Sequence, residues 1–197
     1  MKSLNQYIKE KLIINKDYRD LGLSPKSFKE LRKIIEQRYE EKGPGTEQNP
    51  IDFNDIDVSG INVLGAYAGS SNGTGLFEGI EFEYIDISDW NVSNITDISF
   101  MFYECKNLKS IGYLSKWDVS KVESMESMFY RCYELESIGD LSKWDVSKVK
   151  SMIGMFAHCK TLTSVGDLSN WDVSNVKYMS YMFHDSGIKN TPSWYKV

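Results

Sequence analysis

Residues 117–143 read WDVSKVESMESMFYRCYELESIGDLSK, and the same pattern returns before and after them every 27 residues. Three markers keep this spacing, namely a tryptophan, a Met-Phe pair and a cysteine. A fixed period of this length predicts a repeat architecture in which each unit completes its core against its neighbours. The tryptophans and cysteines that mark the period are Trp90, Trp117, Trp144, Trp171, Cys105, Cys132 and Cys159.

Each unit combines two kinds of apolar spacing. The first part has the spacing of one face of a short helix, and the Ser120/Glu123 pair before it resembles a capping box. The second part steps through Leu135, Ile138 and Gly139 to the next Leu and Trp, which suits brief strands broken by a glycine turn. The apolar positions of the predicted helix are Val122, Met125, Met128, Phe129 and Cys132.

These patterns predict an α/β repeat solenoid, a stack of 27-residue strand–turn–short-helix units over residues 85–185. Residues 51–84 echo the pattern in degraded form and are interpreted as an atypical capping coil with a Gly-rich loop, and residues 186–197 as a C-terminal cap. Residues 1–42 are expected to form a two-helix appendage, with a first helix from Ser3 and a second from Ser24-Pro25. Residues 43–50, GPGTEQNP, are interpreted as a linker.

The phrase W-D-V-S-x-V-x-x-M-x-x-M-F, followed by C-x-x-L-x-x-I, resembles the BspA-like leucine-rich repeats, in particular those of bacterial surface proteins, mycoplasmas and phages. The resemblance covers about residues 85–185 and implies that the stack is leucine-rich-repeat-like. It also implies a role in adhesion or recognition, without a shared catalytic residue. Residues 5–12 also resemble a short leader found on assorted proteins of large tailed phages. That second resemblance implies an address or docking tag on a phage-encoded protein.

Charge and hydropathy exclude several classes of partner. The net charge is −5, with about +4 on residues 1–42 and about −9 on the remainder, which argues against a nucleic-acid binder. No run of 18 apolar residues predicts a membrane span, and charged residues at 9–11 interrupt any signal-peptide core. The expected location is the cytoplasm, or a virus particle if the protein is phage-encoded. Three cysteines, an odd number, favour reduced thiols.

The chain offers no constellation typical of an enzyme, so no catalytic residue, metal or cofactor is assigned. His158 and His184 are interpreted as surface residues, and the cysteines as buried small hydrophobic side chains rather than zinc ligands. The aspartates that follow the tryptophans suit either turn and capping hydrogen bonds or a calcium ladder, and the turn interpretation is preferred. They are Asp118, Asp145 and Asp172.

The positions that vary between otherwise similar units are where a binding surface could be built. Because interfaces favour Tyr and Arg, the tyrosines and the arginine beside the predicted strand are included. We therefore expect a non-enzymatic module that binds another protein, with oligomeric state left open; the alternative is a structural or packaged component of a phage particle docked through residues 1–42. The predicted protein-binding residues are Lys106, Lys109, Tyr130, Arg131, Tyr133, Glu136, Lys160 and Thr163.

Overall fold

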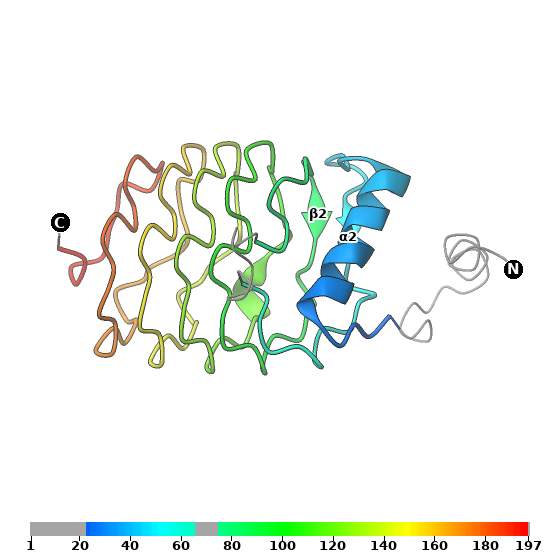
Figure 1. Ribbon diagram of the computed structural model, residues 1–197. Coiled ribbons are helices and arrows are strands. Elements are labelled where there is room, and N and C mark those ends of the chain that lie inside the picture. Colours follow the sequence, from blue (N-terminus) through cyan, green and yellow to red (C-terminus); the bar gives the residue numbers. More distant parts are fainter. Residues whose placement is uncertain (1–22, 66–74, 197) are drawn as a thin grey trace, which may run out of the picture.

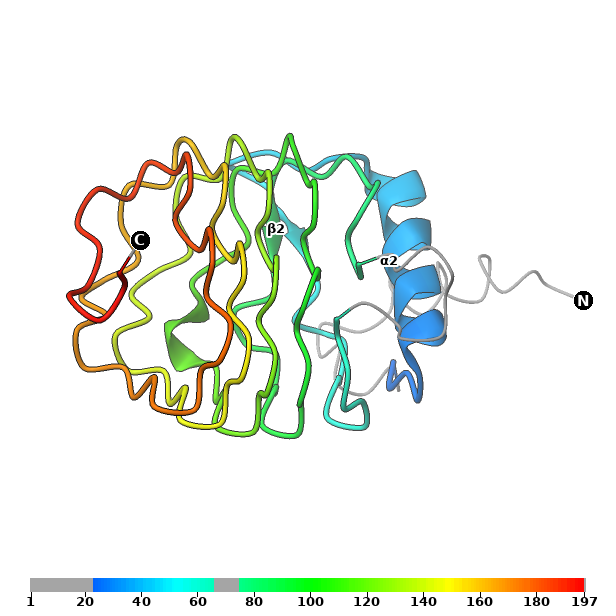
Figure 2. The ribbon, with the colours of Figure 1, turned by 60° about the vertical axis from the view of Figure 1, so that its left-hand side comes forward.

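The computed structural model describes residues 23–65 and 75–196. Its regular elements are the α-helix α2 (Phe28–Lys42), the strands β1 (Ile51–Asp52) and β2 (Ile85–Asp86), and the short 3-10 turn η2 (Leu114–Lys116). The rest of the chain runs through similar 27-residue coils that lie side by side, with α2 at one end and the C-terminus at the other (Figures 1 and 2).

The fold class predicted from the sequence is wrong. A leucine-rich-repeat solenoid of strand–turn–short-helix units requires a strand and a helix in every unit. The described residues instead contain one α-helix, which lies outside the repeats, and two parallel strands of two residues each. The repeats themselves consist of turns, bends and isolated bridges.

The segment expected to be a short helix is a chain of turns because its backbone visits the left-handed region twice in each coil. Ser127 has a φ of 52° and Arg131 a φ of 61°, and the equivalent positions of the other coils also have positive φ. An α-helix cannot contain such residues, since every residue in it needs a negative φ. At one of these positions the chain has Gly154, which adopts a φ of 59° without a Cβ penalty.

Alternate backbone amides of these turns donate to the neighbouring coil, and amides between them close turns within the coil, as that of Tyr130 does to the carbonyl of Ser127 at 3.2 Å. The amide of Met125 donates to the carbonyl of Ser151 at 3.0 Å, and that of Phe129 to the carbonyl of Met155 at 3.0 Å. A second line of contacts joins Tyr84 to Ser110 and then Ser110 to Ser137 by parallel bridges. Each coil is therefore held to the next on two sides.

The core is a set of side-chain columns that run along the stack. Each tryptophan of the period is buried and donates its indole N–H to a backbone carbonyl of the preceding coil; Trp144, for example, bonds to Leu114 at 3.0 Å. The tryptophans Trp144 and Trp171 stack at 6.4 Å between ring centroids. The phenylalanines stack at 4.8–5.8 Å and form the column Phe77, Phe102, Phe129, Phe156 and Phe183.

Helix α2 closes the N-terminal end of the stack. Its N-cap is Ser27, whose hydroxyl accepts from the amide of Glu30, so the helix begins three residues later than the sequence predicts. Leu31 and Ile35 are fully buried in the common core. The predicted two-helix appendage is wrong: α2 is the single α-helix within the described residues, and the helix expected from Ser3 lies outside them.

Candidate protein-binding surface

All eight predicted binding residues reach the surface, but they do not form one site. Four are exposed and four are half-buried because they pack on neighbouring coils. The structure divides them into a groove, a tyrosine–arginine cluster, a tyrosine–lysine pair and a separate threonine. The exposed ones are Lys106, Glu136, Lys160 and Thr163, and the half-buried ones are Lys109, Tyr130, Arg131 and Tyr133.

The groove lies on the side of the stack where Tyr84, Ser110 and Ser137 form parallel bridges. It encloses about 480 Å³ and brings together the predicted residues Lys109 and Glu136. Its walls carry both signs of charge together with tyrosine. The other residues that line it are Glu47, Pro50, Tyr84, Ile85, Asp86, Ser88, Ser110, Gly112, Tyr113, Lys116 and Ser137.

Lys109 is held in place within this groove by three interactions. Its backbone amide donates to the carbonyl of Glu83 at 2.7 Å, and its Nζ donates to the Glu83 carboxylate at 2.8 Å. The ammonium also lies 5.5 Å from the ring centroid of Tyr84. The hydrogen bond to Glu83 raises the pKa of Lys109, so the side chain carries its charge throughout the neutral range. A fixed cation beside an aromatic ring needs little reordering when a partner binds.

Tyr113 is the residue of the groove that sequence reasoning missed. Its side chain is 66% exposed, the highest value among the large hydrophobic residues described. Gly112, with a φ of 76°, makes the turn before it, and a Cβ there would lie 2.4 Å from a carboxylate oxygen of Asp86. The two following coils have Asp140 and Asp167 at the position of Tyr113. An aromatic residue at a position that is aspartate in the next two coils was the sequence signal that could have identified Tyr113.

The tyrosine–arginine cluster joins two neighbouring coils. Tyr103 and Tyr130 stack at 5.2 Å, and the Arg131 guanidinium lies 5.1 Å from the Tyr130 ring centroid. Arg131 also pairs with Glu104 at 2.6 Å, and Lys106 pairs with the same carboxylate at 3.3 Å. Burial opposes the ionisation of Glu104, but the hydrogen bonds from Arg131 and Lys106 outweigh it and lower its pKa. These side chains therefore hold one another as well as facing solvent.

Two histidines continue this cluster toward the C-terminus. The ring of His158 lies edge-on to Tyr130 and to His184, with centroids 5.4 Å apart in both cases. Its Nδ1 lies 3.0 Å from a carboxylate oxygen of Asp185. The two histidines occupy positions that differ by one residue in successive units, and the structure brings their rings into contact. The interpretation of both as surface residues did not include this contact.

The remaining predicted residues lie apart from the groove. The ammonium of Lys160 is 5.8 Å from the ring centroid of Tyr133. Thr163 lines a second hollow, of about 500 Å³, beside the C-terminal segment that contains Ile188 and Pro192.

The cysteines are free and buried, as predicted. The thiol of Cys132 donates to the carbonyl of Phe102 at 3.1 Å, and its counterparts bond in the same way to the preceding coil. Burial raises the pKa of the Cys132 thiol well above its ordinary value and that of Cys159 to about 12. Thiols of this kind are poor nucleophiles and poor metal ligands at neutral pH.

The aspartates after the tryptophans form Asx turns. The carboxylate of Asp118 accepts from the amide of Ser120 at 3.1 Å, and Asp145 and Asp172 repeat the bond in their own coils. Within residues 23–65 and 75–196 there is no group of three or more His, Cys, Asp or Glu side chains that could hold a metal ion. No helix in the same part of the chain is long and apolar enough to cross a membrane.

Comparison with known proteins identifies one family. Neither the curated proteins nor the solved structures contain a match to the chain. The model of the family described as "Mycoplasma protein of unknown function, DUF285" matches residues 72–194, which is more than half of the chain and includes every tryptophan of the 27-residue period. The chain therefore belongs to this family.

Proposed function

We propose that the protein is a non-enzymatic binding module that holds a segment of another protein in the groove around Lys109 and Tyr113. The observation that carries the proposal is the pairing, in one hollow, of a highly exposed tyrosine with a lysine already fixed by Glu83 and Tyr84. Exposed tyrosine gives a large contact area at low entropic cost, and a preformed cation avoids the cost of ordering.

The charges of the groove favour a protein partner over a nucleic acid. Lys109 and Lys116 lie beside Glu47, Asp86 and Glu136, so that phosphates would meet more repelling groups than attracting ones. A polypeptide segment with side chains of both signs complements such a surface. The net charge of −5 on the whole chain supports the same preference.

We also propose a more specific relation than the family match itself gives. The W-D-V-S-x-V-x-x-M-x-x-M-F phrase supports a place among the BspA-like repeats of bacterial surface proteins, mycoplasmas and phages, a group associated with recognition. The phage-particle alternative receives no support from α2, because Leu31 and Ile35 are buried against the first coil and are not available for docking elsewhere.

Affinity enrichment from native cell extract tests the proposal with three full-length baits. The wild type and a Lys148→Glu control, whose exposed side chain lies outside the groove, should retain the same partner. A Lys109→Glu, Tyr113→Ala double variant should lose about tenfold or more of it, the loss expected when an aromatic and a charged anchor are both removed. Equal retention by all three baits would place binding elsewhere.

A further inference from the structure

The hydrogen bonds that join the turn segments of successive coils share one direction, whereas those of the adjacent line, such as the Lys150 amide to the Glu123 carbonyl at 2.8 Å, run the opposite way. In the turn segment, alternate amides of one coil donate to alternate carbonyls of the next coil toward the C-terminus, at 2.7–3.1 Å. The peptide groups therefore form four columns whose dipoles point the same way, as they do along a helix. The donors to the last coil are Met152, Gly154, Phe156 and His158, and the acceptors are Tyr178, Ser180, Met182 and His184.

At the N-terminal end of the stack, backbone carbonyls that face away from the coils accept hydrogen bonds from an arginine. The Arg32 guanidinium of α2 donates to the carbonyls of Gly75, Leu76 and Glu78 at 2.7–2.9 Å. Leu76 begins one of the four columns, because the next amide, that of Phe77, donates to Met101 at 2.9 Å. A positive group thus closes the carbonyl end of this column, as a cation stabilises the C-terminus of a helix.

At the C-terminal end the corresponding amides are open. We call residues 171–185 the end coil. The amides of Met179, Tyr181, Phe183 and Asp185 occupy the donor positions of the four columns, yet they donate to no residue that the structure describes. These four aligned donors, at the positive end of the columns, form a row of sites for hydrogen-bond acceptors, beside the carbonyl of Lys177, whose counterpart Lys150 accepts from the amides of Lys177 and Tyr178.

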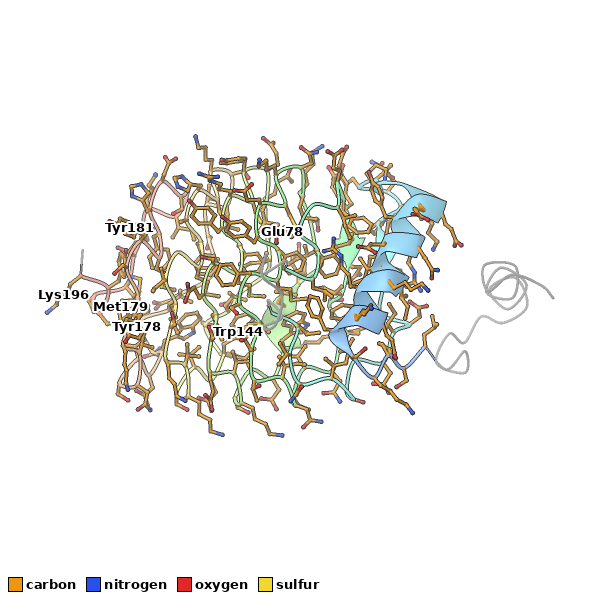
Figure 3. The ribbon with its side chains drawn as sticks, viewed as in Figure 1. Glu78, Trp144, Tyr178, Met179, Tyr181 and Lys196 are labelled. Carbon is orange, nitrogen blue, oxygen red and sulfur yellow. The ribbon has the colours of Figure 1, made fainter. Side chains whose placement is uncertain are left out.

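The apolar surface beside these amides is also uncovered. Val146, Val149 and Met152 are buried in the preceding coil, at 1% exposure or less, whereas their counterparts in the end coil are half-buried. Tyr178 and Tyr181 are 59% and 63% exposed. Figure 3 places these two tyrosines and Met179 together at the end of the molecule where Lys196 projects. The half-buried counterparts are Val173, Val176 and Met179.

The C-terminal segment covers a different part of the end coil. Trp194 stacks on Trp171 at 6.3 Å, and Tyr195 lies edge-on to Phe183 at 5.1 Å. The tryptophan and phenylalanine columns are therefore closed by residues 188–195, and the open part is the side that carries Val173, Val176 and Met179.

We propose that this open side docks a coil-like backbone segment of another polypeptide, which presents carbonyl oxygens at alternate residues as residues 151–157 do. The occupant is inferred from continuity, because the three coils that contain Met101, Met128 and Met155 use the equivalent amides and the equivalent buried apolar positions to bind their successors. An ordinary β-strand fits less well, since the residues along its edge present both N–H and C=O groups to a neighbour.

A second copy of this chain fits less well for a related reason. If two end coils met face to face, the free backbone amides of one copy would face the free backbone amides of the other. Head-to-tail stacking would need the carbonyl of Leu76, to which Arg32 of α2 already donates. This docking side is separate from the groove of the proposed function, and neither depends on the other.

Amide hydrogen exchange of the full chain, measured by NMR, tests the inference directly. The probe is a synthetic peptide with the sequence of residues 144–170, which carries the required carbonyl edge. Without peptide, the four end-coil amides should exchange at least about a hundredfold faster than those of Met152 and Phe156. Peptide at millimolar concentration should slow them about tenfold or more, and a control peptide with both Met155 and Phe156 changed to Asp should not.

Variants of the full chain locate the effect. Met179→Asp should abolish the protection by peptide, whereas Tyr113→Asp, in the groove, should leave it unchanged. The inference is overturned if saturating peptide leaves the four amides as fast as before. It is also overturned if the amides become protected without peptide as the protein concentration rises, because the occupant would then be a second copy.

Discussion

Truncation of Trp144 to alanine should remove much of the stability of the protein. The side chain is 4% exposed, stacks on Trp171 and donates its indole N–H to Leu114 at 3.0 Å. A buried tryptophan covers about 200 Å² of surface, which at about 25 cal/mol per Å² corresponds to about 5 kcal/mol. Measured losses for Trp→Ala in cores are about 3–5 kcal/mol, and we expect a loss in this range.

Urea unfolding followed by tryptophan fluorescence measures this loss, because four of the five tryptophans remain in the variant. Since small domains are stable by only about 5–15 kcal/mol, the midpoint should fall by a large fraction. Trp144→Phe keeps an aromatic ring in the column and should cost less, while Tyr133→Ala at the surface should change stability by about 1 kcal/mol or less. A Trp144→Ala variant as stable as wild type would refute the role of the tryptophan column.

Two further predictions concern groups that repeat from coil to coil. Cys132 should resist thiol reagents in the native protein, because its thiol is buried with a raised pKa; rapid labelling would contradict this, and Cys132→Ala should cost about 1–2 kcal/mol. Side-chain and backbone hydrogen bonds with the serine two residues later lower the pKa values of Asp118, Asp145 and Asp172 from 3.8, so their stabilisation is present above that pH and is lost as pH falls through the lowered values. Asn91 already makes the same turn, so Asn can replace all three aspartates. The triple Asn variant should lose less stability than the wild type between about pH 5 and pH 2, and an equal loss in both proteins would contradict the role given to these carboxylates.

The buried set was predictable from the sequence, whereas the secondary structure was not. The period of 27 residues identified Trp144, Phe129 and Cys132 as interior positions, and all three are buried. The apolar spacing around Phe129 equally suits a helix and a series of turns, since both return a side chain to one face after three or four residues. The left-handed conformations of Ser127 and Arg131 decide between the two, and non-glycine residues carry little sequence signal for that conformation.

The groove was predictable in part. Lys109 and Glu136 were selected because they vary between units, and the structure places both in one hollow. Tyr113 was overlooked because the comparison of units centred on the predicted strand, whereas this residue lies one step beyond Gly112. The contribution of Glu83 could not be inferred, since it belongs to the degenerate first coil, where the alignment of repeats is weakest.

The most direct test of the binding proposal is site-specific photo-crosslinking in cells that express the full chain. A photoreactive phenylalanine analogue replaces Tyr113 in one variant and Lys148, an exposed residue outside the groove, in another. The account predicts a discrete protein adduct from position 113, which Lys109→Glu in the same chain weakens about tenfold, and no such adduct from position 148. Adducts from position 148 alone, or an adduct at 113 that is indifferent to Lys109→Glu, would contradict it.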